Sequence, residues 1–242
     1  GATSPDQQDK RLDDAFAAGV FTVRDRHLPG IWPVGETLGG GNIGHTFGVN
    51  STDERSLTSA MLWGRKLVDE YERYYKQYLR GFENMTLTAT GSLLGVRESR
   101  RILGDAVLGL EDFERRAVFA DEIGRYAYPV DVHAARPDEA NFRQFEEEFR
   151  RLRYRDGDSY GIPYGCLLPR GLDNVLVAGR CVSTDRFLQG SLRVMPGCYI
   201  TGQAAGMAAA LAVEKGLAPR ALDVGLLQAR LRAAGAYLPN AA

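Results

Sequence analysis

The spacing of apolar residues predicts several helices in the first two thirds of the chain. Residues 7–18 are amphipathic at helical spacing. The clearest helix starts after Ser51 and Glu54, which have the spacing of a capping box, and it ends at Gly81. Its tyrosines are expected to form a face packed on the core, with their hydroxyls at the edge. Two more helices are predicted over 110–116 and 138–153, the second highly charged and solvated.

The last third is more apolar and predicts a strand followed by two helices. Residues 175–178 read as a short buried strand. A long helix is expected over 196–215, with Pro196 in its first turn and Gly216 after its end, and a final helix over 224–234. Further strands are predicted over 21–24, 85–90 and 128–133, and a long irregular loop over 30–48.

Composition excludes some classes of function. The chain has 242 residues and 44% hydrophobic content, and 30 basic residues balance 31 acidic ones. Without a strong field of either sign, nucleic acid is not expected as a partner. The longest apolar run, 204–213, is too short to span a bilayer, so no membrane association is expected. Three scattered cysteines without a C-x-x-C motif fit a reducing, cytoplasmic location.

A glycine-rich loop over 35–48 contains a G-x-G-x-x-G spacing at residues 39–44. A dinucleotide fingerprint needs a strand before it and a helix after it. Here Pro33 and Gly35 precede the glycines, and residues 45–48 do not resemble a helix start. We therefore reject a pyrophosphate role. Two interpretations remain, a flexible loop and a loop whose backbone approaches a flat ligand closely.

The predicted helix over 196–215 carries small residues on one face. Gly202, Gly206 and Ala210 lie four residues apart, and such a face lets a strand, a second helix or a cofactor come close. A helix start carries unpaired N–H groups and partial positive charge, which favour anions such as the N1 and O2 edge of reduced flavin. Arg193, just upstream, could add a full charge. Tight helix–sheet packing explains the small residues equally well, and any anion would benefit from the helix start.

Four segments in order carry a resemblance that decides between these readings. They are GVRESRR at 95–101, DNVLVAGRC at 173–181, GSLRVMP at 190–196 and GQAAG at 202–206. Together they resemble the FAD-dependent oxidoreductase family with a glutathione-reductase-like domain, which includes HdrA-like relatives. The resemblance spans about residues 41–216 and implies FAD as cofactor.

The same resemblance implies the fold class and its division. It is α/β, the C-terminal part of a two-domain FAD-binding (glutathione-reductase-like) flavoprotein with a mixed α+β cap or substrate domain. Residues 1–160 would form the cap and residues 161–242 the FAD-binding part. The family also implies an N-terminal strand–GxGxxG–helix unit, which we do not find here. We therefore expect this Rossmann-type half in another chain or a missing segment, and interpret the sequence as a fragment or subunit.

The implied activity is hydride transfer between flavin N5 and a small organic substrate. On the substrate side, His45 could do acid–base work or be an exposed loop histidine. Arg97 could anchor a carboxylate or pair with Glu98 or Asp105. No Asp, Glu or His spacing suggests a metal site. The residues expected to bind the cofactor are Gly179, Arg180, Arg193, Met195, Thr201, Gly202, Gln203 and Ala204.

Two other functions stay open. The chain could be an FAD-containing electron-transfer subunit of a multi-protein redox complex, although it lacks iron–sulfur cysteines of its own. It could also be a non-catalytic assembly subunit that lost the cofactor. The spacing of the residues does not distinguish these alternatives from an enzyme.

Overall fold

The computed structural model describes residues 5–27 and 30–240, and the chain divides into two compact units. Unit 1 comprises Gly1–Val96 and His133–Phe145, and unit 2 comprises Arg97–Val132 and Glu146–Ala242. The units interleave along the chain. The expected division into a cap over 1–160 and an FAD-binding part over 161–242 stays a prediction.

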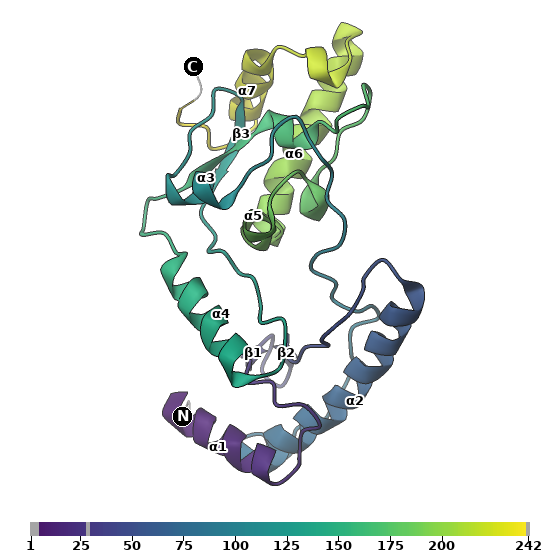
Figure 1. Cartoon of the computed structure of the whole chain (residues 1–242), viewed down its shortest axis with the longest axis vertical. Helices are drawn as coiled ribbons and strands as arrows, with labels where there is room; N and C mark the ends of the chain where they lie inside the picture. The colour runs from purple at the N-terminus through teal and green to yellow at the C-terminus, as the bar shows by residue number, and fades with distance from the viewer. Residues whose placement is uncertain (1–4, 28–29, 241–242) are drawn as a thin grey trace. The chain divides into compact units, whose positions relative to one another are not determined.

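Unit 1 is built on two helices that lie side by side, α1 (Pro5–Ala17) and α2 (Glu54–Tyr78) (Figure 1). Arg11 Nη1 donates to the Tyr78 carbonyl oxygen at 3.1 Å. The tyrosine face of α2 packs on the core as predicted. The buried residues of this core are Leu12, Ala15, Phe16, Leu67, Tyr71, Tyr74, Tyr75 and Leu79.

Two local details of unit 1 differ from the sequence-based expectations. The N-cap of α2 is Asp53 rather than Ser51, because the Asp53 carboxylate accepts the Ser56 N–H at 2.7 Å. Residues 21–24 do not form a strand. Instead, Thr22 is held by the buried Glu70 of α2, which accepts its N–H at 3.0 Å and its hydroxyl at 2.9 Å.

The glycine-rich loop of unit 1 contains a small hairpin instead of being irregular throughout. Strand β1 (Ile31–Pro33) pairs antiparallel with β2 (Gly39–Gly41). No helix follows β2 before α2 begins at Glu54, so the G-x-G-x-x-G spacing here lacks the helix of a dinucleotide fingerprint.

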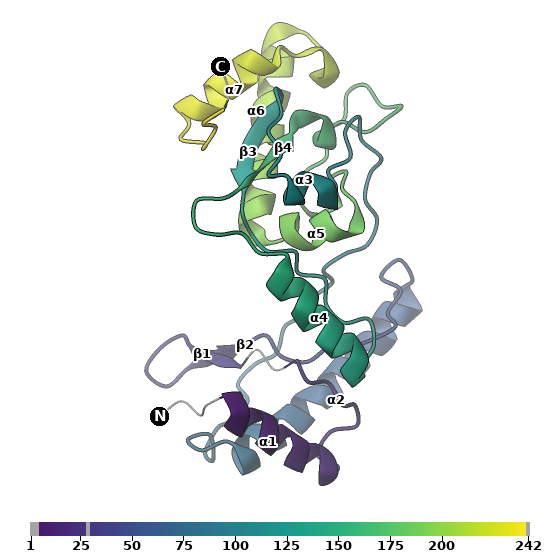
Figure 2. The same cartoon turned by 60° about the vertical axis from the view of Figure 1, so that its left-hand side comes forward.

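Unit 2 is built around an antiparallel strand pair and two helices. Strand β3 (Glu122–Tyr126) pairs with β4 (Tyr160–Pro163), and β3 contacts both α6 (Met195–Lys215) and α7 (Val224–Ala233) (Figure 2). The core between them is largely aliphatic, with Tyr160 and Cys166 also fully buried in it. Its most deeply buried aliphatic members are Leu108, Ile123, Ile162, Leu167, Leu188, Leu192, Ala204, Ala208, Leu227 and Leu231.

The remaining helices are short or charged. The solvated helix predicted over 138–153 forms as α4, which has no buried residue, and the boundary between the units falls inside it. The bounds are α3 (Leu110–Glu114), α4 (Glu139–Arg151) and α5 (Arg186–Leu192), with 3₁₀ helices at Tyr164–Leu167, Gly179–Cys181 and Pro219–Ala221.

Three further predicted strands are wrong, besides the one over 21–24. Residues 85–90 and 128–133 are not strands, and β3 lies N-terminal to the second of these ranges. Residues 175–178 are not a strand either; Val175 is 36% exposed, and the Val177 N–H bonds to the Leu167 carbonyl oxygen at 2.9 Å without a ladder. A strand needs a neighbour along its length, which the described residues do not supply here.

The described part of the chain thus combines helices with two two-stranded antiparallel sheets. This mixture of helices and small sheets is consistent with the expected α/β class, whereas the two-domain glutathione-reductase-like arrangement stays a prediction. Among the described residues, no helix is both long enough and apolar enough to cross a membrane.

Candidate functional site

Helix α6 begins at a close junction with α5. Its N-cap, Val194, is extended and gives no side-chain hydrogen bond, and Pro196 fits the first turn because no N–H is needed there. A Cβ on Gly197 would lie 2.4 Å from the Leu192 carbonyl oxygen. Glycine at this position therefore allows the first turn of α6 to lie directly against the end of α5.

Helix α6 is apolar around most of its circumference, yet only one face is buried. A helix of this kind is normally covered on all sides. Met195 and Tyr199 are each 68% exposed. A Cβ on Gly202 or Gly206 would meet nothing within 4 Å, so the backbone there is open to a ligand. The exposed face consists of Met195, Tyr199, Gly202, Gln203, Gly206, Ala209, Ala210 and Val213.

The predicted segment at Gly179–Cys181 meets the start of α6. The Gly179 N–H donates to the Thr201 hydroxyl oxygen at 3.0 Å. That hydroxyl lies 3.1 Å from the carbonyl oxygens of Gly197 and Cys198, to which it donates. Thr201 therefore joins the two segments that the sequence placed near a cofactor.

The expected cofactor-binding side chains lie on different faces of the helix. Thr201 and Ala204 are fully buried and face the core, so their side chains cannot line a ligand on the exposed face. Met195, Gly202 and Gln203 lie on the exposed face, and Arg180 is exposed in the adjoining 3₁₀ helix. Thr201 and Ala204 position α6 through packing and hydrogen bonding.

The Arg193 side chain forms hydrogen bonds and an ion pair with Asp131. Its Nη2 donates to the Asp131 carbonyl oxygen at 2.9 Å and to the Asp131 carboxylate at 3.1 Å. Burial lowers the pKa of Arg193, and Asp131 opposes that shift. Arg193 thus ties the segment around Asp131 to the α5–α6 junction.

Arg97 lies in the same unit near this junction. Its carbonyl oxygen accepts a hydrogen bond from the Gln189 side chain at 3.0 Å, and its charge contributes to lowering the pKa of Arg193. The two acidic residues considered as its partners each lie near another arginine as well. Glu98 lies 3.8 Å from Arg101, and Asp105 pairs with Arg220.

Tyr126 is a candidate site residue near the start of α6 that the sequence analysis did not identify. Burial raises the pKa of its phenol, while the polar backbone N–H of Gly197, in the first turn of α6, acts in the opposite direction. Its ring stacks on that of Tyr128, with centroids 6.4 Å apart. The alternation Tyr-Ala-Tyr at residues 126–128, at the end of β3, is the sequence feature that could have identified Tyr126.

His45 lies in unit 1, on a loop that packs against α2. Gly44 has φ +78, and a Cβ there would lie 2.7 Å from the Tyr71 ring. Both ring nitrogens of His45 have partners: Nδ1 lies 2.8 Å from Asp25 Oδ2, and Nε2 lies 2.9 Å from His133 Nδ1. His45 is therefore half-buried and oriented, not an exposed loop histidine.

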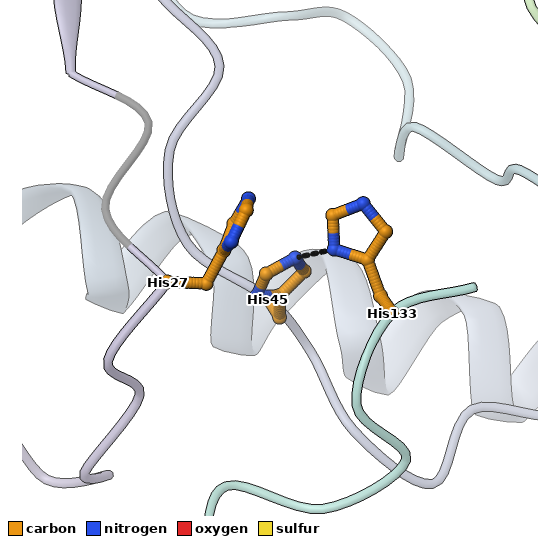
Figure 3. A group of neighbouring side chains, drawn as sticks. All are labelled: His27, His45 and His133. Atoms are coloured by element: carbon orange, nitrogen blue, oxygen red, sulfur yellow. Dashed lines mark hydrogen bonds between the residues drawn. The ribbon is translucent and has the colours of Figure 1, made fainter. Parts of the chain in front are cut away.

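The three histidines of the chain gather at this point. Figure 3 shows the three rings side by side, and each pair of ring centroids is 4.7–4.9 Å apart. One nitrogen from each ring lies within 4.8 Å of the others. Local spacing gave no sign of this cluster, because 88 residues separate His45 from His133.

Comparison with known proteins identifies the cofactor. Residues 4–231 match the family model described as FAD dependent oxidoreductase. No curated protein and no solved structure matches the chain significantly. Since the match covers nearly the whole sequence, the cofactor is FAD and the activity is that of an oxidoreductase. The chain belongs to the FAD-dependent oxidoreductase family.

Proposed function

We propose that this chain supports hydride transfer to or from a small organic substrate, with the ring end of FAD held on the exposed face of α6. The observation that carries the proposal is the open, apolar first half of α6, where Gly202 and Gly206 leave the backbone uncovered. When bound, FAD supplies the hydride acceptor or donor at N5.

The residues of this face fit a flat aromatic ring. Gly202 and Gly206 allow close approach of a plane, and the flexible thioether of Met195 can adapt to it. The Gln203 amide offers both a donor and an acceptor to a polar ring edge. Arg180 adds a positive charge from the adjoining 3₁₀ helix.

The start of α6 favours negative charge. Its first backbone N–H groups and its helix dipole give partial positive charge at this end. An electron-rich ring edge near this turn would be stabilised by that charge.

On the substrate side we propose Arg97 as an anchor for an anionic group, because a guanidinium binds a carboxylate in a bidentate manner. The acid–base role expected for His45, which belongs to unit 1, is a separate proposal and an alternative to its use as a metal ligand. A direct acid–base role for it requires the hydrogen bond from His45 to His133 or to Asp25 to open.

The pyrophosphate end of FAD needs a strand–GxGxxG–helix unit, and we propose that sequence outside these 242 residues supplies it. The rest of the exposed face of α6 supports this proposal. Ala209, Ala210 and Val213 continue the uncovered stripe beyond Gly206, and a packed domain would bury it.

The test is a visible absorption spectrum of the purified chain, alone and with a dinucleotide-binding segment, followed by anaerobic reduction. We expect bound flavin in the combined preparation and bleaching by a small organic donor. Flavin that is reduced by a protein partner but by no small donor would favour the electron-transfer alternative. No flavin in either preparation would favour an assembly subunit.

A further inference from the structure

We propose that His27, His45 and His133 bind a divalent transition-metal ion of the zinc class. This inference concerns unit 1 alone and does not depend on the proposed flavin site. All three histidines of a 242-residue chain meet here, from segments far apart in the sequence. Three imidazoles are the protein ligand set of a well-known kind of catalytic zinc site.

The geometry is close to that of a metal centre. The three candidate nitrogens lie within 4.8 Å of one another, and His45 Nε2 and His133 Nδ1 are 2.9 Å apart. Two nitrogens on a tetrahedral zinc ion lie about 3.3 Å apart, given Zn–N bonds of about 2.0–2.1 Å. Small rotations of the rings would therefore admit an ion between them.

Asp25 gives His45 the orientation that a ligand needs. With His45 Nδ1–H donating to the Asp25 carboxylate at 2.8 Å, the Nε2 lone pair points at the cluster. A carboxylate on the outer nitrogen is the usual support of a metal-binding histidine, because it fixes the tautomer and raises ligand basicity.

Without a metal, the contact between His45 and His133 requires a proton between two nitrogens. Nitrogen Nε2 of neutral His45 is an acceptor when Nδ1 donates to Asp25, so His133 Nδ1 must donate. A divalent ion replaces that proton and uses both lone pairs together with one from His27. All three rings can then serve as ligands of one ion.

The surroundings suit a site with an open position. The Phe145 ring stacks on His133, with centroids 5.1 Å apart, and Phe47 lies 5.7 Å from His45. These rings restrict solvent without adding charge. The histidines themselves are only half-buried, which leaves access for water or a substrate oxygen. Imidazole ligands favour zinc, copper, iron or nickel over magnesium or calcium.

The test is a titration of the chelator-treated chain, free of any histidine tag, with Zn²⁺ and Co²⁺. We expect one ion per chain, visible Co²⁺ absorption typical of nitrogen ligands, and a higher melting temperature with Zn²⁺. His45→Gln and His133→Gln should each abolish stoichiometric binding. Asp25→Asn should weaken it by roughly 10–100-fold, as for other outer-shell carboxylates.

Two matched variants make the test specific. Asp13→Asn removes another carboxylate of unit 1, one that pairs with Arg26, and should bind as the wild type does. Cys181→Ser removes an exposed thiol that could bind metal adventitiously, and it should also leave binding unchanged. Circular dichroism checks that each variant is folded.

The proposal is overturned if the wild type binds no Co²⁺ or Zn²⁺ stoichiometrically, or if Zn²⁺ leaves its melting temperature unchanged. It is equally overturned if folded His45→Gln binds like the wild type, or if Cys181→Ser alone abolishes binding. None of these measurements requires bound flavin. The metal-binding result can therefore be interpreted even if the flavin proposal fails.

Discussion

Gly44 determines where His45 lies, for two physical reasons. Its φ of +78 is a left-handed conformation that other residues adopt with strain, and a Cβ would collide with the Tyr71 ring at 2.7 Å. Tyr71 belongs to the buried face of α2, so its ring has little room to move. The loop therefore takes its position from the helix behind it.

We predict that Gly44→Ala destabilises the protein by about 2–3 kcal/mol and weakens metal binding at the histidine cluster. Gly48→Ala is the matched control, because Gly48 also has positive φ, +68, but has open space around it. It should cost only about 1 kcal/mol of strain. Urea unfolding measures both, and equal losses would show that the Tyr71 contact is unimportant.

Cys166 makes stability depend on pH in the alkaline range. Burial raises the pKa of its thiol from 9.0 to about 12. Below pH 9 the thiol is protonated in both folded and unfolded chains. Between pH 9 and 12 the unfolded chain loses this proton and the folded chain retains it, so stability falls as pH rises.

We therefore predict that Cys166→Ala removes part of the alkaline loss of stability. The wild type should lose up to about 1.4 kcal/mol per pH unit more than the variant in this range. Unfolding free energies between pH 8 and 10.5 give the comparison. Parallel curves for the two proteins would contradict a buried, protonated thiol.

The β3–β4 pair contains a buried ion pair that connects its strands to the loop before β4. Glu122 is fully buried and accepts from Arg125 Nη1 at 2.8 Å. Arg125 also donates to the Ser159 hydroxyl at 2.9 Å and to the Ser159 carbonyl oxygen at 2.7 Å. One guanidinium thus binds the Glu122 carboxylate of β3 and Ser159, the residue before β4.

Arg125→Met should cost about 3–5 kcal/mol, because it leaves the Glu122 carboxylate buried without its charge partner. Arg143→Met is the control, since the exposed pair of Arg143 with Glu139 on α4 should contribute less than about 0.5 kcal/mol. Thermal or urea unfolding compares them. A similar small loss in both would contradict a structural role for the buried pair.

Helix ends were well predicted because their signals are local. Pro196 and Gly216 bracket α6 within a residue of its observed bounds, and Gly216 takes the left-handed conformation expected of a C-cap. The strands were predicted poorly. Strand β4 and helix α5 were missed, and residues 175–178 were assigned to a strand, because pairing and burial depend on distant neighbours.

At the scale of the molecule, a larger side chain on the exposed face of α6 should raise the stability of the chain and lower its affinity for the cofactor. Gly202 lies in the helix interior with no neighbour near a Cβ. Replacing it should stabilise the helix by about 0.5–1 kcal/mol, since glycine is a poor helix former. The same side chain would stand where we propose that a flat ring approaches.

We predict that Gly202→Leu raises the melting temperature of the chain but lowers the flavin content of the complete protein at least tenfold. Ala229→Leu, on an exposed position of α7, is the control and should retain flavin. The ratio of flavin to protein absorbance measures loading. Full loading of Gly202→Leu would place the ring elsewhere.

The sequence by itself determined the family, the cofactor and most helices. Ordered motifs such as 173–181 and 202–206 carry the family, and helix caps and periodicity act within a few residues. These signals survive without knowledge of the fold, since each motif and each cap is a short stretch of sequence and the motifs are recognised by their order along the chain.

Only the tertiary structure decided which side chains can act. In the folded chain the side chains of Thr201 and Ala204 lie in the core, whereas Gly202 and Gln203 are exposed, although the four residues are consecutive in sequence. The fold also gathered His27, His45 and His133, which no local spacing relates. The physical reason is the same in both cases: burial and long-range contact depend on how the elements pack, and packing is a property of the folded chain.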